Sequence, residues 1–282
     1  MSMISFPTVS YIIPVYNHEQ YIVQTLDSIL LDTYPNKEIL IINDGSTDAC
    51  HEKIQSWLKI HENDITVVYK SRENKGITRT LNELISMSSG QYIIPIASDD
   101  YLINDMTSHR IEVLKNNPEK LMLINDAIVV NENNDITFAS GNFELYGGNK
   151  NNFFSEEGLI SEIVRNWSCV GPICIMDKRI YDQIGYYDTD IPIEDWDFYL
   201  RASAKKLILF EDIKVSAYRI HNNNAHATLS NRVNMLKAIA QTAHQNRKNF
   251  DFPFNIILYF KYIKSNLSMI KLYVLSKYFN LL

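Results

Sequence analysis

The stretch Tyr92-Ile93-Ile94-Pro95-Ile96-Ala97-Ser98-Asp99-Asp100 runs from apolar residues into two adjacent carboxylates. An apolar run of this length predicts a short buried strand, and the two aspartates follow at its end. Adjacent carboxylates repel each other, so a fold that holds them at a strand end usually has a cation beside them. An ordinary turn is the alternative, because Ser-Asp-Asp also suits turns. The stretch alone leaves both interpretations open.

The composition is that of a globular protein without a nucleic-acid partner. The chain has 282 residues, 46% hydrophobic and 21% charged, which is enough for one large domain with a substantial core. Its net charge of −6 provides no basic field that would attract nucleic acid.

Cysteine usage and the N-terminus favour a cytoplasmic location. Cys50, Cys169 and Cys174 form no Cys-x-x-Cys pair and suggest no disulfide framework, which fits a reducing compartment. Residues 1–7 lack the basic flank and long apolar core of a signal peptide, and no apolar run reaches the length of a membrane span.

The first hundred residues alternate between predicted strands and helices. The strands are expected at residues 9–15, 38–42, 65–69 and 92–96, and the helices at 19–31, 48–60 and 77–87, with Gly90 as the last C-cap. This alternation is typical of a parallel sheet covered by helices, in which ligands bind beyond the carboxyl ends of the strands. The polar residues expected at that edge are Asn17, Asp44, Arg79, Asp99 and Asp100.

The following hundred residues are less regular. Their pattern predicts helices at residues 105–116 and 177–185 and strands at 121–124, 127–130, 173–176, 207–210 and 215–218. Asn125-Asp126 is expected to separate two of these strands. Residues 131–157 are expected to form a long loop or hairpin, either a binding loop or plain variable surface.

An acidic cluster marks the start of another predicted helix. Pro192, Glu194 and Asp195 suit a helix N-terminus, and Asp197 is one turn from Arg201, with which it can pair. Glu194 and Asp195 have no basic partner nearby in the sequence, so they are either helix-capping acids or functional carboxylates.

Taken together, these motifs resemble family 2 glycosyltransferases of the GT-A fold, of the kind that build bacterial surface polysaccharide. The matching pieces, in order over about residues 8 to 224, are Pro14-Val15-Tyr16-Asn17, Asn43-Asp44-Gly45-Ser46-Thr47-Asp48, Asn74-Lys75-Gly76 with Arg79 and Asn82, Ser98-Asp99-Asp100, Glu194-Asp195-Trp196-Asp197 and Tyr218-Arg219-Ile220-His221. The resemblance implies an α/β fold with a Rossmann-like nucleotide-binding half (residues 1–102), an acceptor-binding half (103–228) and a C-terminal helical extension (229–282).

The resemblance also implies a chemistry. The enzyme would move a sugar, with inversion, from a UDP-sugar to a glycan or lipid-linked glycan, with Mn²⁺ or Mg²⁺ neutralising the departing diphosphate. Asp100 would be the direct metal ligand and Asp99 would contact ribose or metal. His221 would contact the metal or diphosphate, or be structural. Asp195 would be the general base that deprotonates the acceptor hydroxyl, with Glu194 orienting it or the acceptor.

The remaining expected contacts are to the nucleotide sugar. They come from Pro14, Val15, Tyr16, Asn17, Glu19, Asp44, Arg79, Ser98 and Asp99. By resemblance Asp44 accepts a hydrogen bond from uracil and Arg79 lies near the base and diphosphate, although an exposed helical arginine is an equally simple interpretation. Many family members carry two acids where this chain has Asn43-Asp44. Trp167 and Trp196 are candidates either for sugar stacking or for the core.

Residues 250–282 predict a helix with lysines and serines on one stripe and apolar residues elsewhere. This pattern suits a helix at the inner face of a membrane, or one packed on the main domain or on a second subunit. Two other functions were weighed. A nucleotidyltransferase would need a Gly-rich phosphate loop, which residues 14–17 do not provide. A non-catalytic nucleotide-sugar-binding or scaffold protein would not need the acids, which are intact.

Overall fold

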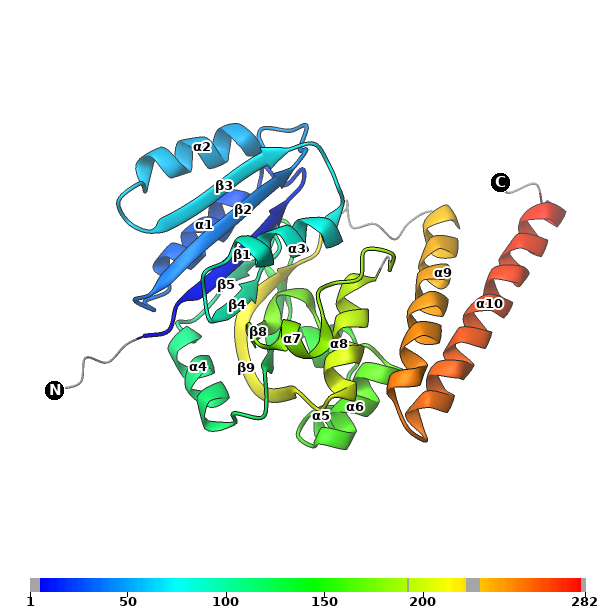
Figure 1. Cartoon of the computed structure of the whole chain (residues 1–282). Helices are drawn as coiled ribbons and strands as arrows, with labels where there is room; N and C mark the ends of the chain where they lie inside the picture. The colour runs from blue at the N-terminus through cyan, green and yellow to red at the C-terminus, as the bar shows by residue number, and fades with distance from the viewer. Residues whose placement is uncertain (1–5, 192, 222–228, 280–282) are drawn as a thin grey trace.

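The computed structural model describes residues 6–191, 193–221 and 229–279. In these residues the strands form one nine-stranded sheet in the order β3-β2-β1-β4-β8-β6-β9-β5, with β7 paired to β6. Figure 1 shows helices on both sides of this sheet and a pair of long helices, α9 and α10, at the end far from β3.

The first half of the sheet is parallel, as the alternating pattern predicted. Its elements are β1 (Val9–Val15), α1 (Ile22–Leu31), β2 (Lys37–Asp44), α2 (Cys50–Ile60), β3 (Thr66–Arg72), α3 (Ile77–Met87) and β4 (Tyr92–Pro95). β1 pairs in parallel with β2 and β4, and β2 with β3. Parallel neighbours need helical crossovers, so the carboxyl ends of these strands meet at one edge.

Alternate side chains of β1 supply two separate cores. Tyr11 and Ile13 pack with α1, α2 and α4 (Thr107–Asn116) on one face of the sheet. Ile12 packs with α3 and with helices from the second half on the other face. A strand whose two faces are both covered is apolar throughout, which explains the run Val9-Ser10-Tyr11-Ile12-Ile13.

Two strands in the second half are longer than predicted. β6 (Met122–Val130) continues through Asn125-Asp126, and β9 (Ile208–Arg219) is one strand rather than two. The fully buried Asp126 is tolerated because Lys214 Nζ lies 2.6 Å from its carboxylate, and Asn125 donates to the Glu211 carbonyl at 3.0 Å. These partners, together with register shifts between β6 and β9, satisfy polar groups that would otherwise end a buried strand.

The segment 131–157 is ordered rather than an open loop. It begins with the hairpin to β7 (Ile136–Phe138) and continues into a π-helix, η1 (Gly141–Leu145), and α5 (Lys150–Phe153). Asp126 again organises it: it accepts from the Ser140 hydroxyl at 2.5 Å and from the Asn142 amide at 3.0 Å.

Smaller boundaries also differ. α1 and α2 begin two to three residues later than expected, and Ser88, not Gly90, is the C-cap of α3. Gly90 serves another purpose, because a Cβ there would come within 2.5 Å of Ser10 Oγ. The remaining elements are β5 (Tyr101–Leu102), α6 (Glu156–Arg165), η2 (Gly171–Ile173), β8 (Cys174–Asp177), α7 (Ile180–Ile184) and α8 (Glu194–Ala204). Pro192 and residues 222–228 lie outside the described residues.

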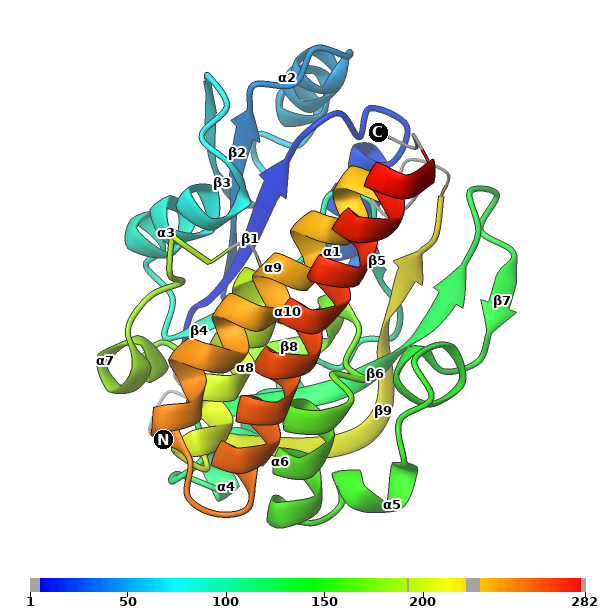
Figure 2. The ribbon, with the colours of Figure 1, turned by 90° about the vertical axis from the view of Figure 1, so that its right-hand side faces the viewer.

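The C-terminal helices form a hairpin. α9 (Leu229–Asn246) and α10 (Phe254–Phe279) lie side by side, joined through η3 (Arg247–Asn249), and α10 also runs beside α6 (Figure 2). None of the helices in the described ranges combines the length and apolar character needed to cross a membrane.

Candidate active site

Three side chains that are far apart in the sequence converge beside the end of β4. His221 Nε2 lies 3.0 Å from Asp99 Oδ2, and His18 Nδ1 lies 3.6 Å from Asp99 Oδ1. One ligand atom from each residue lies within 4.8 Å of the others. Divalent cations sit about 2.0–2.6 Å from their ligands, so ligand atoms around one ion are separated by up to about twice that length. The three residues therefore fit a single divalent cation.

Asp100 is not part of this set. Its carboxylate is buried and accepts from the Arg219 amide at 2.8 Å. Burial, followed by the charge of Asp99, raises its pKa well above the usual value. The sequence predicts Asp100 as the direct metal ligand. In the structure its Oδ1 holds the acidic segment against β9, and the side chains that lie together as possible ligands are those of His18, Asp99 and His221.

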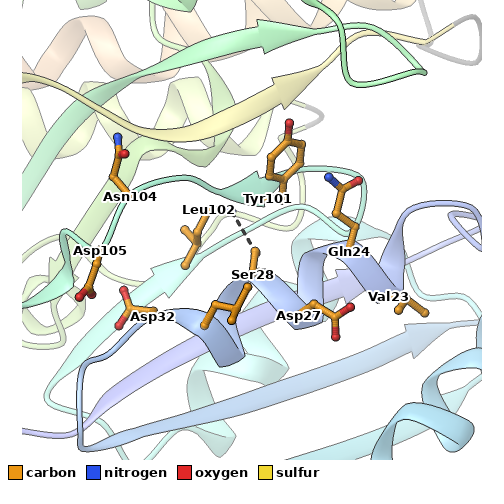
Figure 3. A pocket seen from close by; sticks show the side chains of 10 residues that line it. Val23, Gln24, Asp27, Ser28, Asp32, Tyr101, Leu102, Asn104 and Asp105 are labelled. Atoms are coloured by element: carbon orange, nitrogen blue, oxygen red, sulfur yellow. Dashed lines mark hydrogen bonds between the residues drawn. The ribbon is translucent and has the colours of Figure 1, made fainter.

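Helix α1 and Arg219 fix the acidic segment from two sides. The Thr25 hydroxyl donates to the Asp100 carbonyl at 2.6 Å and lies 3.0 Å from that of Ser98. Arg219 is fully buried and its Nε donates to the Asp99 carbonyl at 2.8 Å. Ser28 adds a further bond by accepting from the Leu102 amide at 3.0 Å (Figure 3). These bonds hold the backbone of the acidic segment in place.

A cavity of about 560 Å³ lies between α1 and the residues around β5, and Figure 3 shows the side chains that line it. Its three carboxylates are engaged by the protein: Asp27 accepts from Trp57, Asp32 from Thr107, and Asp105 from the Thr33 amide. Each carboxylate of this cavity thus has a partner within the protein, and Ser28 in its wall supports the chain that follows the acidic segment.

A second cavity, of about 400 Å³, lies at the carboxyl edge of the parallel strands. Several predicted nucleotide contacts line it: Pro14, Val15, Tyr16, Asp44 and Ser98, together with His18, Asn74, Gly76, Ile77 and Ala97. His18 and Ser98 connect this cavity to the metal-binding set, since His18 Nδ1 is hydrogen-bonded to Ser98 Oγ at 2.8 Å.

Asp44 is held by the loop that follows β3. Its Oδ1 accepts from Arg72 and from the Lys75 amide at 2.8 Å, and its Oδ2 accepts from the Gly76 amide at 3.0 Å. A carboxylate has about four acceptor positions, so Oδ2 retains capacity for one more donor. Asp44 thus shapes the cavity and can still receive a hydrogen bond from a base.

Arg79 does not line this cavity. Its side chain is exposed, and the residue that contacts Asp44 is Arg72, which also pairs with Glu83 at 3.1 Å. Sequence reasoning missed Arg72 because the predicted strand ended at Tyr69. In the actual register Arg72 is the direct neighbour of Asp44 across β2 and β3.

Asn17 and Glu19 have local structural contacts. Asn17 Oδ1 accepts from the Thr47 amide at 2.8 Å and Glu19 Oε2 accepts from the Ala49 amide at 2.8 Å. Both side chains join the loop after β1 to the loop before α2. They therefore hold in place the loop after β1, which forms part of the cavity wall.

Glu194 and Asp195 are the first two residues of α8. This helix begins on the same side of the molecule as the carboxyl ends of β1 and β2 (Figure 1 and Figure 2). Asp195 accepts from the Trp196 amide at 2.7 Å. Burial raises the pKa of both carboxyls, and the charge of Asp195 adds to the effect on Glu194, whose pKa rises to about 7. Neither acid has a cationic side chain within 4 Å among the described residues, unlike Asp197, which pairs with Arg201 at 2.7 Å as predicted.

The two candidate tryptophans pack with the protein. Trp196 is buried and its indole donates to the Ile163 carbonyl at 2.8 Å. Trp167 packs edge-on against Tyr199, with ring centroids 4.8 Å apart. Trp196 therefore belongs to the core rather than to a sugar platform.

A family model described as "Glycosyl transferase family 2" matches residues 10–185, which include the parallel half of the sheet and the Asp99 segment. The chain belongs to glycosyl transferase family 2. It is therefore a glycosyltransferase, as the motifs predicted, and the strands from β1 to β8 lie within the matched region apart from Val9.

Curated relatives include polysaccharide enzymes. The chain is 28% identical over 194 residues to poly-beta-1,6-N-acetyl-D-glucosamine synthase of Staphylococcus epidermidis, covering 66% of this chain and 43% of that protein. It is 39% identical over 97 residues to glycosyltransferase GlyA of Streptococcus pneumoniae, covering 34% of this chain and 14% of that protein. The chain thus spans less than half the length of these relatives.

Two solved structures confirm the GT-A fold of this family 2 chain. The mannosyltransferase PcManGT from Pyrobaculum calidifontis, in complex with GDP-Man and Mn²⁺, superposes with a TM-score of 0.70 at 16% identity over 96% of this chain and 74% of that one. TarS 1–349 of S. aureus in complex with UDP-GlcNAc gives 0.67 at 18% identity over 93% and 73%.

Proposed function

We propose that this glycosyltransferase moves a sugar from a UDP-sugar to a glycan acceptor with inversion, in the synthesis of a bacterial surface polysaccharide. The observation that carries the proposal is the convergence of His18, Asp99 and His221 beside the cavity lined by Asp44. One site can thereby hold a cation next to a nucleotide. The Mn²⁺ and GDP-Man bound by the similar mannosyltransferase support this assignment.

His18, Asp99 and His221 would hold the cation, which supplies positive charge for the departing diphosphate. Two imidazoles and one carboxylate favour Mn²⁺ over Mg²⁺, because Mg²⁺ prefers an all-oxygen shell and imidazole suits transition metals. Thr25, Arg219 and Asp100 orient the Asp99 segment.

Asp44 would select the base. Its free acceptor position on Oδ2 can bind the ring N–H of uracil or guanine, whereas adenine and cytosine present an acceptor at the corresponding ring nitrogen. The carboxylate therefore favours UDP- and GDP-sugars over ADP- and CDP-sugars. The UDP-GlcNAc complex of TarS supports the choice of a uridine donor.

Asp195 would be the general base, with Glu194 as its neighbour. Since no described cation pairs with either acid, their carboxylates are available to an acceptor hydroxyl, and a raised pKa brings a carboxylate closer to that of an ideal base at neutral pH. An inverting transfer needs one such base and no covalent intermediate on the protein.

The proposed location is the cytoplasmic face of the membrane, with a lipid-linked glycan as acceptor. The support is a row of exposed apolar side chains on α10: Ile256, Phe260, Leu267 and Ile270. Their successive spacings of four, seven and three residues put them on one face of the helix. Liposome flotation checks this: replacing Phe260, Leu267 and Ile270 by serine should abolish flotation, and unchanged flotation would remove the membrane assignment.

The function itself is tested by a screen of nucleotide sugars. UDP-, GDP-, CDP- and ADP-sugars are incubated with the protein and Mn²⁺ or EDTA, and release of the nucleoside diphosphate is measured with and without glycan acceptors. Metal-dependent release from a UDP-sugar supports the proposal. Calorimetric binding of UDP with no turnover on any acceptor would instead support a non-catalytic nucleotide-sugar-binding protein.

A further inference from the structure

A groove of about 610 Å³ lies between α6, α9 and α10, away from the nucleotide cavity. Figure 2 shows these three helices side by side, with α10 crossing in front of α6. The volume is within the range of about 300–1,000 Å³ that is typical of small-molecule pockets.

Part of the groove lining is apolar. Leu236 and Ile239 of α9 and Ile257 and Phe260 of α10 line it. Phe260 is 64% exposed and also belongs to the row of exposed apolar side chains on α10, so the groove opens directly onto an apolar surface. A hydrocarbon chain can therefore enter from that surface without crossing a polar rim.

The lining of the groove also includes cations. Arg165, Lys261 and Lys264 line it, and no carboxylate of a described residue lies within 4 Å of either lysine. Arg165 Nε donates only to the Ser161 hydroxyl, at 3.0 Å. Three positive charges thus border an apolar wall without a neutralising acid from the described part of the chain.

Lys261 is held inside the groove. Its Nζ lies 5.1 Å from the centroid of the Trp196 ring, in the cation–π arrangement, and its stem is partly buried. Burial and the charge of Lys264 lower its pKa, which is the expected behaviour of an ammonium group that lacks an anion. Bound phosphate would remove this unfavourable interaction.

The lysine and serine stripe on α10 lies partly in this groove. The sequence leaves open whether the helix that carries it meets a membrane surface or packs on the main domain or a second subunit. Lys261, Lys264, Ser265 and Ser268 line the groove, and Ser265 is only 6% exposed. The hydroxyls are additional hydrogen-bond donors within the same space.

We propose that this groove binds a single membrane lipid with a phosphate headgroup, its hydrocarbon chain against Leu236, Ile257 and Phe260 and its phosphate among Lys261, Lys264 and Arg165. Charge complementarity selects an anion and the apolar wall selects a chain, so neither a neutral lipid nor a free phosphate satisfies both. The inference uses no part of the donor site and holds whichever sugar is transferred.

The test is calorimetric titration of the full-length chain with dodecyl phosphate below its critical micelle concentration. Dodecyl maltoside is the uncharged control with the same chain, and inorganic phosphate is the control without a chain. The wild type should bind dodecyl phosphate and neither control. Equal binding of inorganic phosphate would show that the groove binds an anion without a hydrocarbon chain. Equal binding of dodecyl maltoside would show that the cations do not contribute to binding. Either result would contradict the proposal.

Two charge-matched variants assign the site. The double variant Lys261→Ala, Lys264→Ala should weaken dodecyl phosphate binding about thirtyfold. This is the loss expected when two lysines that each attract a lipid phosphate are removed. Lys237→Ala with Lys248→Ala removes the same charge from exposed positions of the same helical hairpin and should have no effect. Equal loss in both variants would overturn the proposal.

A third variant tests the hydrocarbon chain. Ser268→Trp fills the groove while leaving all three cations in place, and it should also abolish binding. Circular dichroism melting checks that each variant is folded. If a folded Ser268→Trp protein still binds dodecyl phosphate, the lipid does not occupy this groove. Sedimentation gives a second check: a concentration-dependent dimer that dodecyl phosphate does not dissociate would also contradict the proposal.

Discussion

His221 Nε2 and Asp99 Oδ2 lie 3.0 Å apart, although 122 residues separate them in the chain. The contact joins the end of β9 to the end of β4. It brings the last motif of the sequence into the site that the acidic segment begins, and His18, from the loop after β1, completes the set.

Removing either histidine should weaken the metal site. For His18→Ala and His221→Ala we expect the Mn²⁺ concentration at half-maximal activity to rise by tenfold or more, on the order of losses seen when metal-site partners are removed. His244→Ala is the control, since this histidine is exposed on α9 and lies outside the metal-binding set. An unchanged Mn²⁺ titration in both site variants would contradict the assignment.

The two adjacent aspartates should behave differently. Asp99→Asn removes a charged ligand and should raise the half-saturating Mn²⁺ concentration by about tenfold or more. Asp100→Asn keeps an oxygen that can accept from the Arg219 amide, so its Mn²⁺ titration should match the wild type. If Asp100→Asn loses metal affinity and Asp99→Asn does not, the original prediction of Asp100 as direct ligand is correct.

Activity should depend on the acidic pair at α8. Burial raises the pKa of both carboxyls, that of Glu194 to about 7, and a protonated acid cannot take a proton from the acceptor hydroxyl. Activity should therefore rise with pH through this region. Glu194→Gln removes a neighbouring negative charge, which should lower the apparent pKa of Asp195 and move the acid limb of kcat/KM to lower pH. A limb that stays in place would show that the pair does not set the profile.

Arg72 should matter more than Arg79. Arg72→Ala leaves the buried carboxylate of Asp44 without its cation, and breaking such a pair costs about 3–5 kcal/mol of unfolding free energy. Arg79→Ala removes an exposed side chain with a cost below about 0.5 kcal/mol. Urea unfolding compares the two, and calorimetry with UDP shows whether the cavity survives. A larger UDP defect in Arg79→Ala than in Arg72→Ala would restore the predicted role of Arg79.

The parallel half of the fold could be predicted because its strands are covered on both faces. Runs such as Ile39-Leu40-Ile41-Ile42 are continuously apolar, and the helices between them show one apolar face. The parallel arrangement of the strands and the position of Asp44 and Asp99 at one edge follow from this pattern.

The second half could not be predicted as well, because long-range partners decide it. Asn125-Asp126 looks like a strand break, and its burial depends on partners that are distant in the sequence, such as Lys214, 88 residues from Asp126. The same limit applies to the site. His18 in a turn has no local signal for metal binding, and its proximity to His221 is visible only in three dimensions.

The most direct test of metal-dependent sugar transfer compares the wild type with Asp195→Asn in one assay. Transfer from the UDP-sugar that the screen selects is measured after EDTA treatment and after Mn²⁺ is restored, and UDP binding is measured in parallel. We expect EDTA to abolish transfer, Mn²⁺ to restore it, and Asp195→Asn to lose about 10²–10⁴-fold in kcat while retaining UDP affinity. Full transfer in EDTA, or full transfer by Asp195→Asn, would contradict the proposed mechanism.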